Sequence, residues 1–190
     1  MQSPSEKILD PVVSPLLIGT IHDQLREYDG KRVGDPRPCP NCDSTNLRKN
    51  GYQQAAKTFA RLVTRNGFEE VGLEVQQYEC KDCGHSFQGD LSEHFYENCE
   101  YAKPIVDLCR FHAADNSYHA CERILQQRYG LQVDRDTVKR YAERLEGEPL
   151  QRADIAVGGR KISLPFLAFV FGENLEDSPH FVLTGHRALW

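Results

Sequence analysis

The sequence lacks several features that would point directly to a function. No stretch of its 190 residues approaches the roughly 20 apolar residues that a membrane-spanning helix needs. Residues 1–7 lack the basic and apolar regions of a signal peptide. We find no glycine-rich phosphate loop, no serine–histidine–aspartate arrangement and no internal repeat. These absences predict a cytoplasmic protein that is not inserted in a membrane.

Basic charge is also scarce. The chain has 23 Lys and Arg against 28 Asp and Glu, a net charge of −5, whereas nucleic-acid binders are usually basic. The average conceals an asymmetry, because residues 31–65 carry eight basic residues against two acids and residues 66–100 carry one lysine against nine acids. One part of this region can therefore face phosphate while another repels it, or the whole is an ordinary solvated surface.

Cysteine spacing is the most informative feature that is present. Four of the seven cysteines form two C-x-x-C pairs, Cys39 with Cys42 and Cys80 with Cys83. Two residues between the thiols allow a tight turn to point both sulfurs at one place, and two such turns make a tetrahedral thiolate site for zinc. Two disulfides or four unrelated thiols are the alternatives, and a reducing compartment disfavours the first. We predict a zinc ribbon over residues 37–90.

The residues around these cysteines predict the rest of the ribbon. We expect strands at 47–52, 58–64 and 71–78, a turn after the first of them, a hairpin turn at Asn66-Gly67, and an extra hairpin because the gap is long. Gly84 can supply the positive φ needed to leave the second turn. Residues 1–36 are expected to form a leader and an amphipathic helix that starts at Ser14-Pro15, with a linker at 31–38.

Residues 91–148 show helical periodicity instead. The pattern predicts a first helix from about residue 101, a second that Gly130 ends, and a third that Asp134 caps. Val138 and Tyr141 lie on the apolar stripe of the third helix. Three short helices with a tight link before the last match a helix-turn-helix, although a plain helical bundle with a charged face is the alternative.

The polar face of the third helix supplies candidate contacts to double-stranded DNA. Arginine pairs with guanine edges, and lysine suits phosphates. The candidates are Arg135, Asp136, Thr137, Lys139, Arg140 and Arg144 on this helix, with Arg48 and Lys49 from the ribbon.

The order of these motifs resembles the N-terminal half of prokaryotic insertion-sequence (DDE-type) transposases. The motifs are C-P-N-C at 39–42, K-N-G at 49–51, Y-E-C-K-D-C-G-H-S-F at 78–87 and D-T-V-K-R-Y at 136–141, and the resemblance covers about residues 37–146. In that family an RNase H-like domain follows, in which three acids hold two divalent metals.

Residues 149–190 are where the resemblance places the start of that domain. We expect a strand at 153–157, a turn at Gly158-Gly159 and a longer return strand at 160–171, with Asp154 where the first catalytic acid would fall. Ile155 replaces the acid that often follows it, and about forty residues leave no place for the second Asp and the Glu. The resemblance therefore implies the DNA-recognition part of a transposase without a complete acidic triad.

The fold class expected is α+β: a zinc ribbon, a helix-turn-helix and a short C-terminal hairpin. The apolar segment 164–171 is expected either to pack on the helical part or to pair with a second copy in a homodimer. Two other functions remain open, a stand-alone transcription regulator and a zinc-ribbon module that binds another protein.

Overall fold

The computed structural model describes residues 15–150, 154–157 and 160–171. Its fold class is mixed α+β, as predicted. The elements in chain order are α1 (Pro15–Arg26), β1 (Arg32–Val33), β2 (Leu47–Thr64), β3 (Gly67–Cys80), β4 (Ser86–Gln88), α2 (Lys103–Ala113), α3 (Tyr118–Ile124), the π-helical turn η1 (Leu125–Tyr129), α4 (Arg135–Arg144), β5 (Asp154–Val157), β6 (Arg160–Ser163) and α5 (Leu164–Phe171). The leader with Ser14 and the predicted Gly158-Gly159 turn lie outside the described residues.

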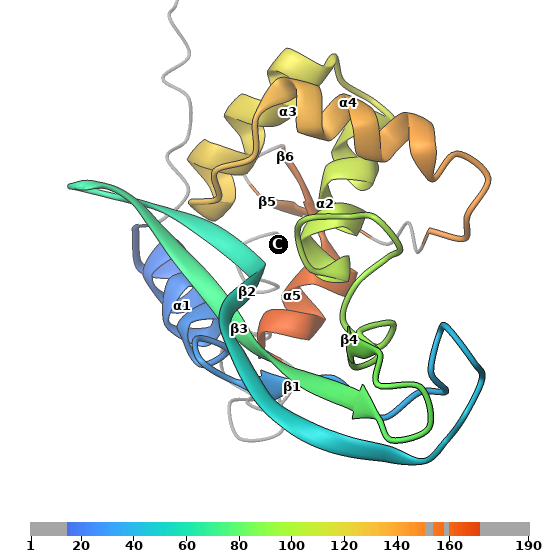
Figure 1. The fold of residues 1–190 in the computed structure, drawn as a ribbon. Helices are drawn as coiled ribbons and strands as arrows, with labels where there is room; N and C mark the ends of the chain where they lie inside the picture. Colours follow the sequence, from blue (N-terminus) through green and yellow to red (C-terminus); the bar gives the residue numbers. More distant parts are fainter. Residues whose placement is uncertain (1–14, 151–153, 158–159, 172–190) are drawn as a thin grey trace, which may run out of the picture.

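A long antiparallel hairpin, β2–β3, runs along one side of the molecule (Figure 1). Its strands pair from Leu47 opposite Cys80 to Thr64 opposite Gly67. The two-residue turn between them consists of Arg65 and Asn66, and Gly67 follows with a φ of 119°. A tight turn is therefore present, one residue earlier than the Asn66-Gly67 turn that the sequence predicted, because Gly67 is already paired with Thr64.

Strand β2 is continuous, which corrects the prediction of two separate strands, a turn after residue 52 and an extra hairpin. It has 18 residues against 14 in β3. Three shifts in register, at 49–52, 53–57 and 58–60, absorb the four additional residues. Such bulges lengthen and bend one strand while the pairing continues on both sides.

The other edge of β3 pairs with two short strands. β1 runs parallel to β3 with Arg32 opposite Glu74, and β4 runs antiparallel with Phe87 opposite Tyr78. The predicted linker at 31–38 thus contains a strand. The segments that follow β1 and β4 approach each other closely at Gly34 and Gly89. A Cβ atom on Gly89 would lie only 2.6 Å from the Gly34 backbone, so a larger residue does not fit there.

The three helices after the sheet begin and end close to the predicted residues. The Ser117 side chain accepts a hydrogen bond from the Ala120 amide at the start of α3, and the Asp134 side chain accepts one from the Thr137 amide at the start of α4. Gly130 ends the second helix with a φ of 66°. The π-helical turn η1 before Gly130 was not predicted.

One large hydrophobic core joins these parts. Its members come from α1, the half of the hairpin near its turn, α2, α3, η1, α4, β6 and α5, and the largest fully buried side chains are Tyr101, Tyr129, Tyr141, Phe59, Ile21, Leu25, Leu62, Leu73, Ile105, Leu108, Leu125 and Leu131. A separate small cluster at the other end of the hairpin holds Cys39, Tyr78, Cys80 and Phe87, with Leu47 packed against it.

The C-terminal segment differs from its prediction. β5 and β6 pair as a hairpin, with Asp154 opposite Ser163, but the return strand ends at Ser163 and residues 164–171 form α5. The Ser163 hydroxyl accepts a hydrogen bond from the Phe166 amide at 3.4 Å, as an N-cap does. Phe166 and Val170 are four residues apart, so they lie on one face of α5, and both are buried in the large core. Within the described residues, the apolar segment thus packs on the helical part.

The described residues include no helix that combines the length and apolar character needed to cross a membrane.

A candidate metal centre and a basic helix

Two turns of nearly identical backbone geometry present the four cysteines. Each turn begins at a cysteine, Cys39 or Cys80, whose amide donates to the carbonyl five residues later, at 2.9 Å in both turns. The carbonyl of the same cysteine accepts from the amide four residues later, at 2.8 Å in the first turn and 2.9 Å in the second. The second cysteine of each pair lies inside the closed loop, which directs its thiol toward the first.

Each turn needs a left-handed residue directly after its second cysteine. In the second turn this residue is Gly84, with a φ of 73°, as the sequence predicted. In the first turn it is Asp43, with a φ of 57°. Aspartate tolerates this region better than most residues. Its equivalence to Gly84 in the two repeated turns is the signal that sequence reasoning missed.

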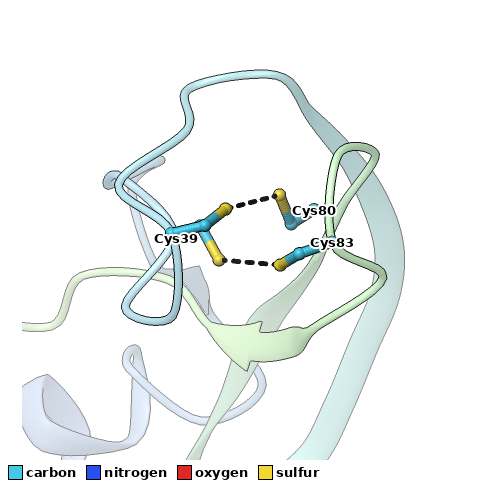
Figure 2. A group of neighbouring side chains, drawn as sticks. Cys39, Cys80 and Cys83 are labelled. Atoms are coloured by element: carbon cyan, nitrogen blue, oxygen red, sulfur yellow. Dashed lines mark hydrogen bonds between the residues drawn. The ribbon is translucent and has the colours of Figure 1, made fainter.

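The four sulfurs converge on one point. Their Sγ atoms all lie within 4.8 Å of one another, with 3.6 Å between Cys39 and Cys83 and 3.6 Å between Cys42 and Cys80. Figure 2 shows Cys39 facing Cys80 and Cys83 from the opposite turn. A tetrahedral zinc–thiolate centre has sulfurs about 3.8 Å apart, given zinc–sulfur bonds of about 2.3 Å. All seven cysteines are free, so this group can hold a metal ion.

Burial and charge differ within the group. Cys39 and Cys80 are buried, whereas Cys42 and Cys83 are exposed. Hydrogen bonds from the Asn41 side chain and the His85 backbone lower the pKa of Cys83 to about 6. For Cys42 the Ser44 backbone lowers the pKa, but the neighbouring thiols outweigh it and raise the pKa to about 12. Because a thiolate is the form that binds a metal, a metal bound here would displace the remaining thiol protons.

A carboxylate ties the two turns together behind the sulfurs. Asp82 accepts hydrogen bonds from the Ser44 hydroxyl and, at 2.8 Å, from the Asn46 side-chain amide. These two contacts, with the Ser44 bond the larger, lower the pKa of Asp82 below its usual value. The Asn46 carbonyl in turn accepts from the Lys81 amide at 2.9 Å. Contacts of this kind around a metal site orient the ligands. No local sequence motif predicts them.

The charged face of α4 lies opposite its buried face. Val138 and Tyr141 are buried in the large core, while Arg135, Asp136, Lys139, Arg140 and Arg144 are exposed. Thr137 is buried as well. Its hydroxyl donates to Asp134 at 2.8 Å, so this side chain belongs to the start of the helix rather than to its outer surface.

Each exposed cation of α4 has a polar neighbour. Arg135 pairs with Asp136 at 3.0 Å, Lys139 with Glu143 at 3.8 Å and Arg140 with Glu100 at 4.0 Å, and Arg144 donates to the Asn98 carbonyl at 3.2 Å. Exposed pairs of this kind contribute roughly 0–1 kcal/mol. They therefore leave Arg135, Lys139 and Arg140 able to exchange the carboxylate for another anion.

The structure does not bring the two ribbon candidates to α4. Arg48 lies on β2 beside the cysteines and pairs with Glu79 at 2.6 Å. Lys49 follows it and lines an open groove of about 500 Å³ together with Arg32 and Tyr52. By contrast, the link that leads into α4 forms a bridge with β2 at Leu62, fourteen residues beyond Arg48. Sequence reasoning did not foresee the groove.

Asp154 is exposed and lies opposite Ser163 in the β5–β6 hairpin. In the part of the chain that the structure describes, the four cysteines are the one group of three or more His, Cys, Asp or Glu side chains close enough to share a metal. Asp154 therefore belongs to no such group among the described residues.

Searches against protein-family models, curated proteins and solved structures returned no match to this chain.

Proposed function

We propose that this chain is a zinc-dependent DNA-binding protein in which α4 enters the major groove of duplex DNA. The observation that carries the proposal is the face of α4, where Arg135, Lys139, Arg140 and Arg144 are exposed while the opposite side of the helix is buried against the core. The major groove admits an α-helix, and the first residues of a recognition helix reach base edges there. In this arrangement Arg135 reads a base, and Lys139 and Arg144 contact phosphates.

The packing around α4 supports this role. The helix follows α3 and η1 after a link of five residues, 130–134, and Asp134 fixes its first turn through the Thr137 amide and hydroxyl. Val133 in the link is buried in the large core. A reading helix must be held rigidly by its supporting helices, and these contacts hold the first turn of α4.

Zinc is the metal we assign to the four cysteines. Four thiolates suit a soft or borderline ion, and the separations between the sulfurs match those of a closed tetrahedral site. With all four positions taken by protein, the metal would supply stability rather than a reactive water.

We extend the proposal to the transposase family that the sequence resembles. We place the chain as the DNA-recognition part of an insertion-sequence transposase, which cannot catalyse transposition alone because the residues described do not assemble an acidic triad around Asp154. A second copy of the chain would allow two such helices to read two half-sites.

A DNA-binding titration tests the proposal directly. Wild-type protein is titrated with the genomic flanks of its gene and with a scrambled duplex, at two salt concentrations, with and without a zinc chelator. We expect binding that prefers the flanks and is lost on chelation. Arg135→Ala should weaken binding by about 1–3 kcal/mol and relax specificity at one position, whereas Lys139→Ala should lower the salt dependence by about one phosphate contact. Equal, weak and salt-sensitive binding to both duplexes contradicts the proposal.

The cysteine end favours a second candidate, a zinc-ribbon module that binds another protein. Arg48 is paired with Glu79, and the groove beside it is lined by both aromatic and charged side chains. A stand-alone transcription regulator is the third candidate, and it predicts a palindromic site and a stable dimer. If the chain binds a protein partner and prefers no duplex over another, the result would support the protein-binding module.

A further inference from the structure

The turn of the β2–β3 hairpin exposes an unusual combination of side chains. We call residues 65–68, Arg65-Asn66-Gly67-Phe68, the hairpin tip. Phe68 is 63% exposed, against 39% for Tyr52 and 37% for Leu164, the other exposed large apolar residues among those described. Figure 1 shows the tip extending past the helices at the left of the view. A large apolar side chain in such a position contributes nothing to the core.

The tip is locally basic although the sequence that follows it is acidic. Glu69 forms two hydrogen bonds with Arg26 of α1, at 2.8 and 2.7 Å. Glu70 is bound by Arg61 at 3.1 Å and by the Thr58 hydroxyl at 2.8 Å. Both nearby acids are thus neutralised within the structure. Arg65 is exposed and has no ion-pair partner among the described residues.

Backbone hydrogen bonds fix the tip relative to α4. The Val63 amide donates to the Gly130 carbonyl at 2.7 Å, and the Gln132 amide donates to the Arg61 carbonyl at 2.8 Å. Leu62 and Leu131 form a β-bridge between them. We call this set of contacts the junction. It joins the strand that leads into the tip to the link that leads into α4.

A salt-bridge network reinforces the junction. The Glu100 carboxylate lies 3.7 Å from Arg61 of β2 and 4.0 Å from Arg140 of α4. The His22 ring of α1 donates to the Gly130 carbonyl at 2.9 Å. Contacts from three elements therefore hold the tip and the start of α4 in one orientation.

Chain geometry limits how far apart the two can be. Arg65 is three residues from Leu62, and Arg135 is four residues from Leu131. Extended chain spans at most about 3.6 Å per residue, and bridged residues lie roughly 5 Å apart, so the two arginine backbones are within roughly 30 Å. One turn of B-DNA is about 34 Å. This separation is compatible with contact of α4 and the tip with neighbouring grooves of one duplex.

We propose that the hairpin tip is a second DNA contact, which enters the minor groove beside the major groove occupied by α4. Arg65 lies along the groove or its phosphates, Asn66 reads the acceptors on the groove floor, and Phe68 presses against a base step. Arginine and asparagine are minor-groove readers, and phenylalanine is a known type of wedge between base pairs. This inference rests on the proposed function of α4.

The experiment uses the full-length zinc-loaded chain and a duplex about three helical turns long, which the wild type selects from a random library. Arg65→Ala should weaken binding about tenfold and lower the slope of log affinity against log salt by about 0.9. Arg65→Lys should keep the slope. Phe68→Ala should weaken binding several-fold without changing the slope, and should reduce the bend measured by energy transfer between the duplex ends. Netropsin, which fills A·T minor grooves, should compete with wild type for the duplex but not with a variant that carries both Arg65→Ala and Phe68→Ala.

Tyr52→Ala is the matched control, because it removes an exposed aromatic ring from the cysteine half of the same hairpin. It should bind as wild type does, and far-UV circular dichroism should show all variants folded. If Arg135→Ala weakens binding but every tip variant binds as wild type, this inference is overturned and the function of α4 stands. If neither Arg135→Ala nor the tip variants alter binding, both fail. If Phe68→Ala changes only self-association in sedimentation, the tip is a contact between copies, and the inference is also overturned.

Discussion

The two ends of the β2–β3 hairpin solve the same stability problem in different ways. At one end, which we call the helix end, Phe59, Leu62 and Leu73 are buried in a core shared with all five helices. At the other, the metal end, the buried cluster contains only Cys39, Tyr78, Cys80 and Phe87, with Leu47 beside it. A cluster of this size cannot offset the entropy of ordering the chain around it.

The comparison shows why the cysteines lie where they do. Hydrophobic burial stabilises the helix end because helices cover it. The metal end extends away from them, and a metal bound by the four thiolates would supply the stability that burial does not.

Removal of the metal should have the largest effect. Structural zinc contributes about 10–16 kcal/mol in small zinc domains. Chelation, or Cys80→Ser, should abolish amide-exchange protection in residues 39–49 and 78–88 while α2–α4 keep theirs, as measured by hydrogen exchange with mass spectrometry. Simultaneous loss of protection in all helices would show that the two ends are not separate sources of stability.

Phe59→Ala should cost about 3–5 kcal/mol in the free energy of unfolding. The Phe59 ring stacks on Tyr28 with centroids 4.2 Å apart and meets Phe95 edge-on at 6.5 Å, so its loss opens a cavity at the helix end. Urea denaturation of the metal-loaded protein measures the cost. Phe68→Ala on the same hairpin is the control and should change stability by no more than about 0.5 kcal/mol.

Acidification should weaken the helix end through His112. Burial lowers the pKa of this ring to about 4, and the Tyr129 hydroxyl lies 2.8 Å from its Nε2. Because the unfolded chain binds the proton more readily, stability should be complete above about pH 6.5 and fall by on the order of 3 kcal/mol as pH drops to about 4. Denaturation midpoints across this range measure the slope, which His112→Gln should flatten and His119→Gln, at an exposed site, should not.

Gly130→Ala should cost about 2 kcal/mol or more. Gly130 has a φ of 66°, and a Cβ would lie 2.3 Å from His22 Nε2 and 2.7 Å from Ile18 Cγ2. Gly51→Ala is matched to it, since Gly51 has a φ of 75° with nothing near its Cβ position. This control should lose only about 1 kcal/mol. If thermal unfolding shows the same loss of stability for both variants, the close contact with α1 does not add to the cost of a side chain at position 130.

Asp43→Gly should have the smallest effect, a gain of a few tenths of a kcal/mol. It relieves the left-handed strain at 57° in the first cysteine turn and makes that turn equivalent to the second. The change should appear as a slightly higher melting temperature with unaltered metal content. A marked loss would show that the Asp43 carboxylate has a structural role of its own.

Features that depend on nearby residues were predicted from the sequence. The caps at Ser117 and Asp134 and the ending at Gly130 involve residues three or four apart, so a short window contains the whole signal. The cysteine cluster is non-local, but the C-x-x-C turns carry strong local signatures, and the four thiols meet as expected. Assignment of DNA-contacting residues on α4 stays a prediction.

Features set by distant contacts were missed. The bulges that keep β2 continuous depend on its register against β3, which no window of β2 reveals. The strand formers in residues 164–171 pointed to a β-strand, but Ser163 caps a helix there and burial of Phe166 against the core decides the outcome. The Asp82 contacts with Ser44 and Asn46 likewise join residues more than thirty positions apart.

The separation of the two buried clusters also sets the order in which the protein can assemble during synthesis. All the residues of the small cluster lie between Cys39 and Phe87, so they are available once residue 87 has left the ribosome. The large core draws on residues from Ile21 to Val170 and cannot close until residue 170 is available. The two turns that hold the cysteines can therefore form first. They give the growing chain a fixed hairpin on which the later helices pack.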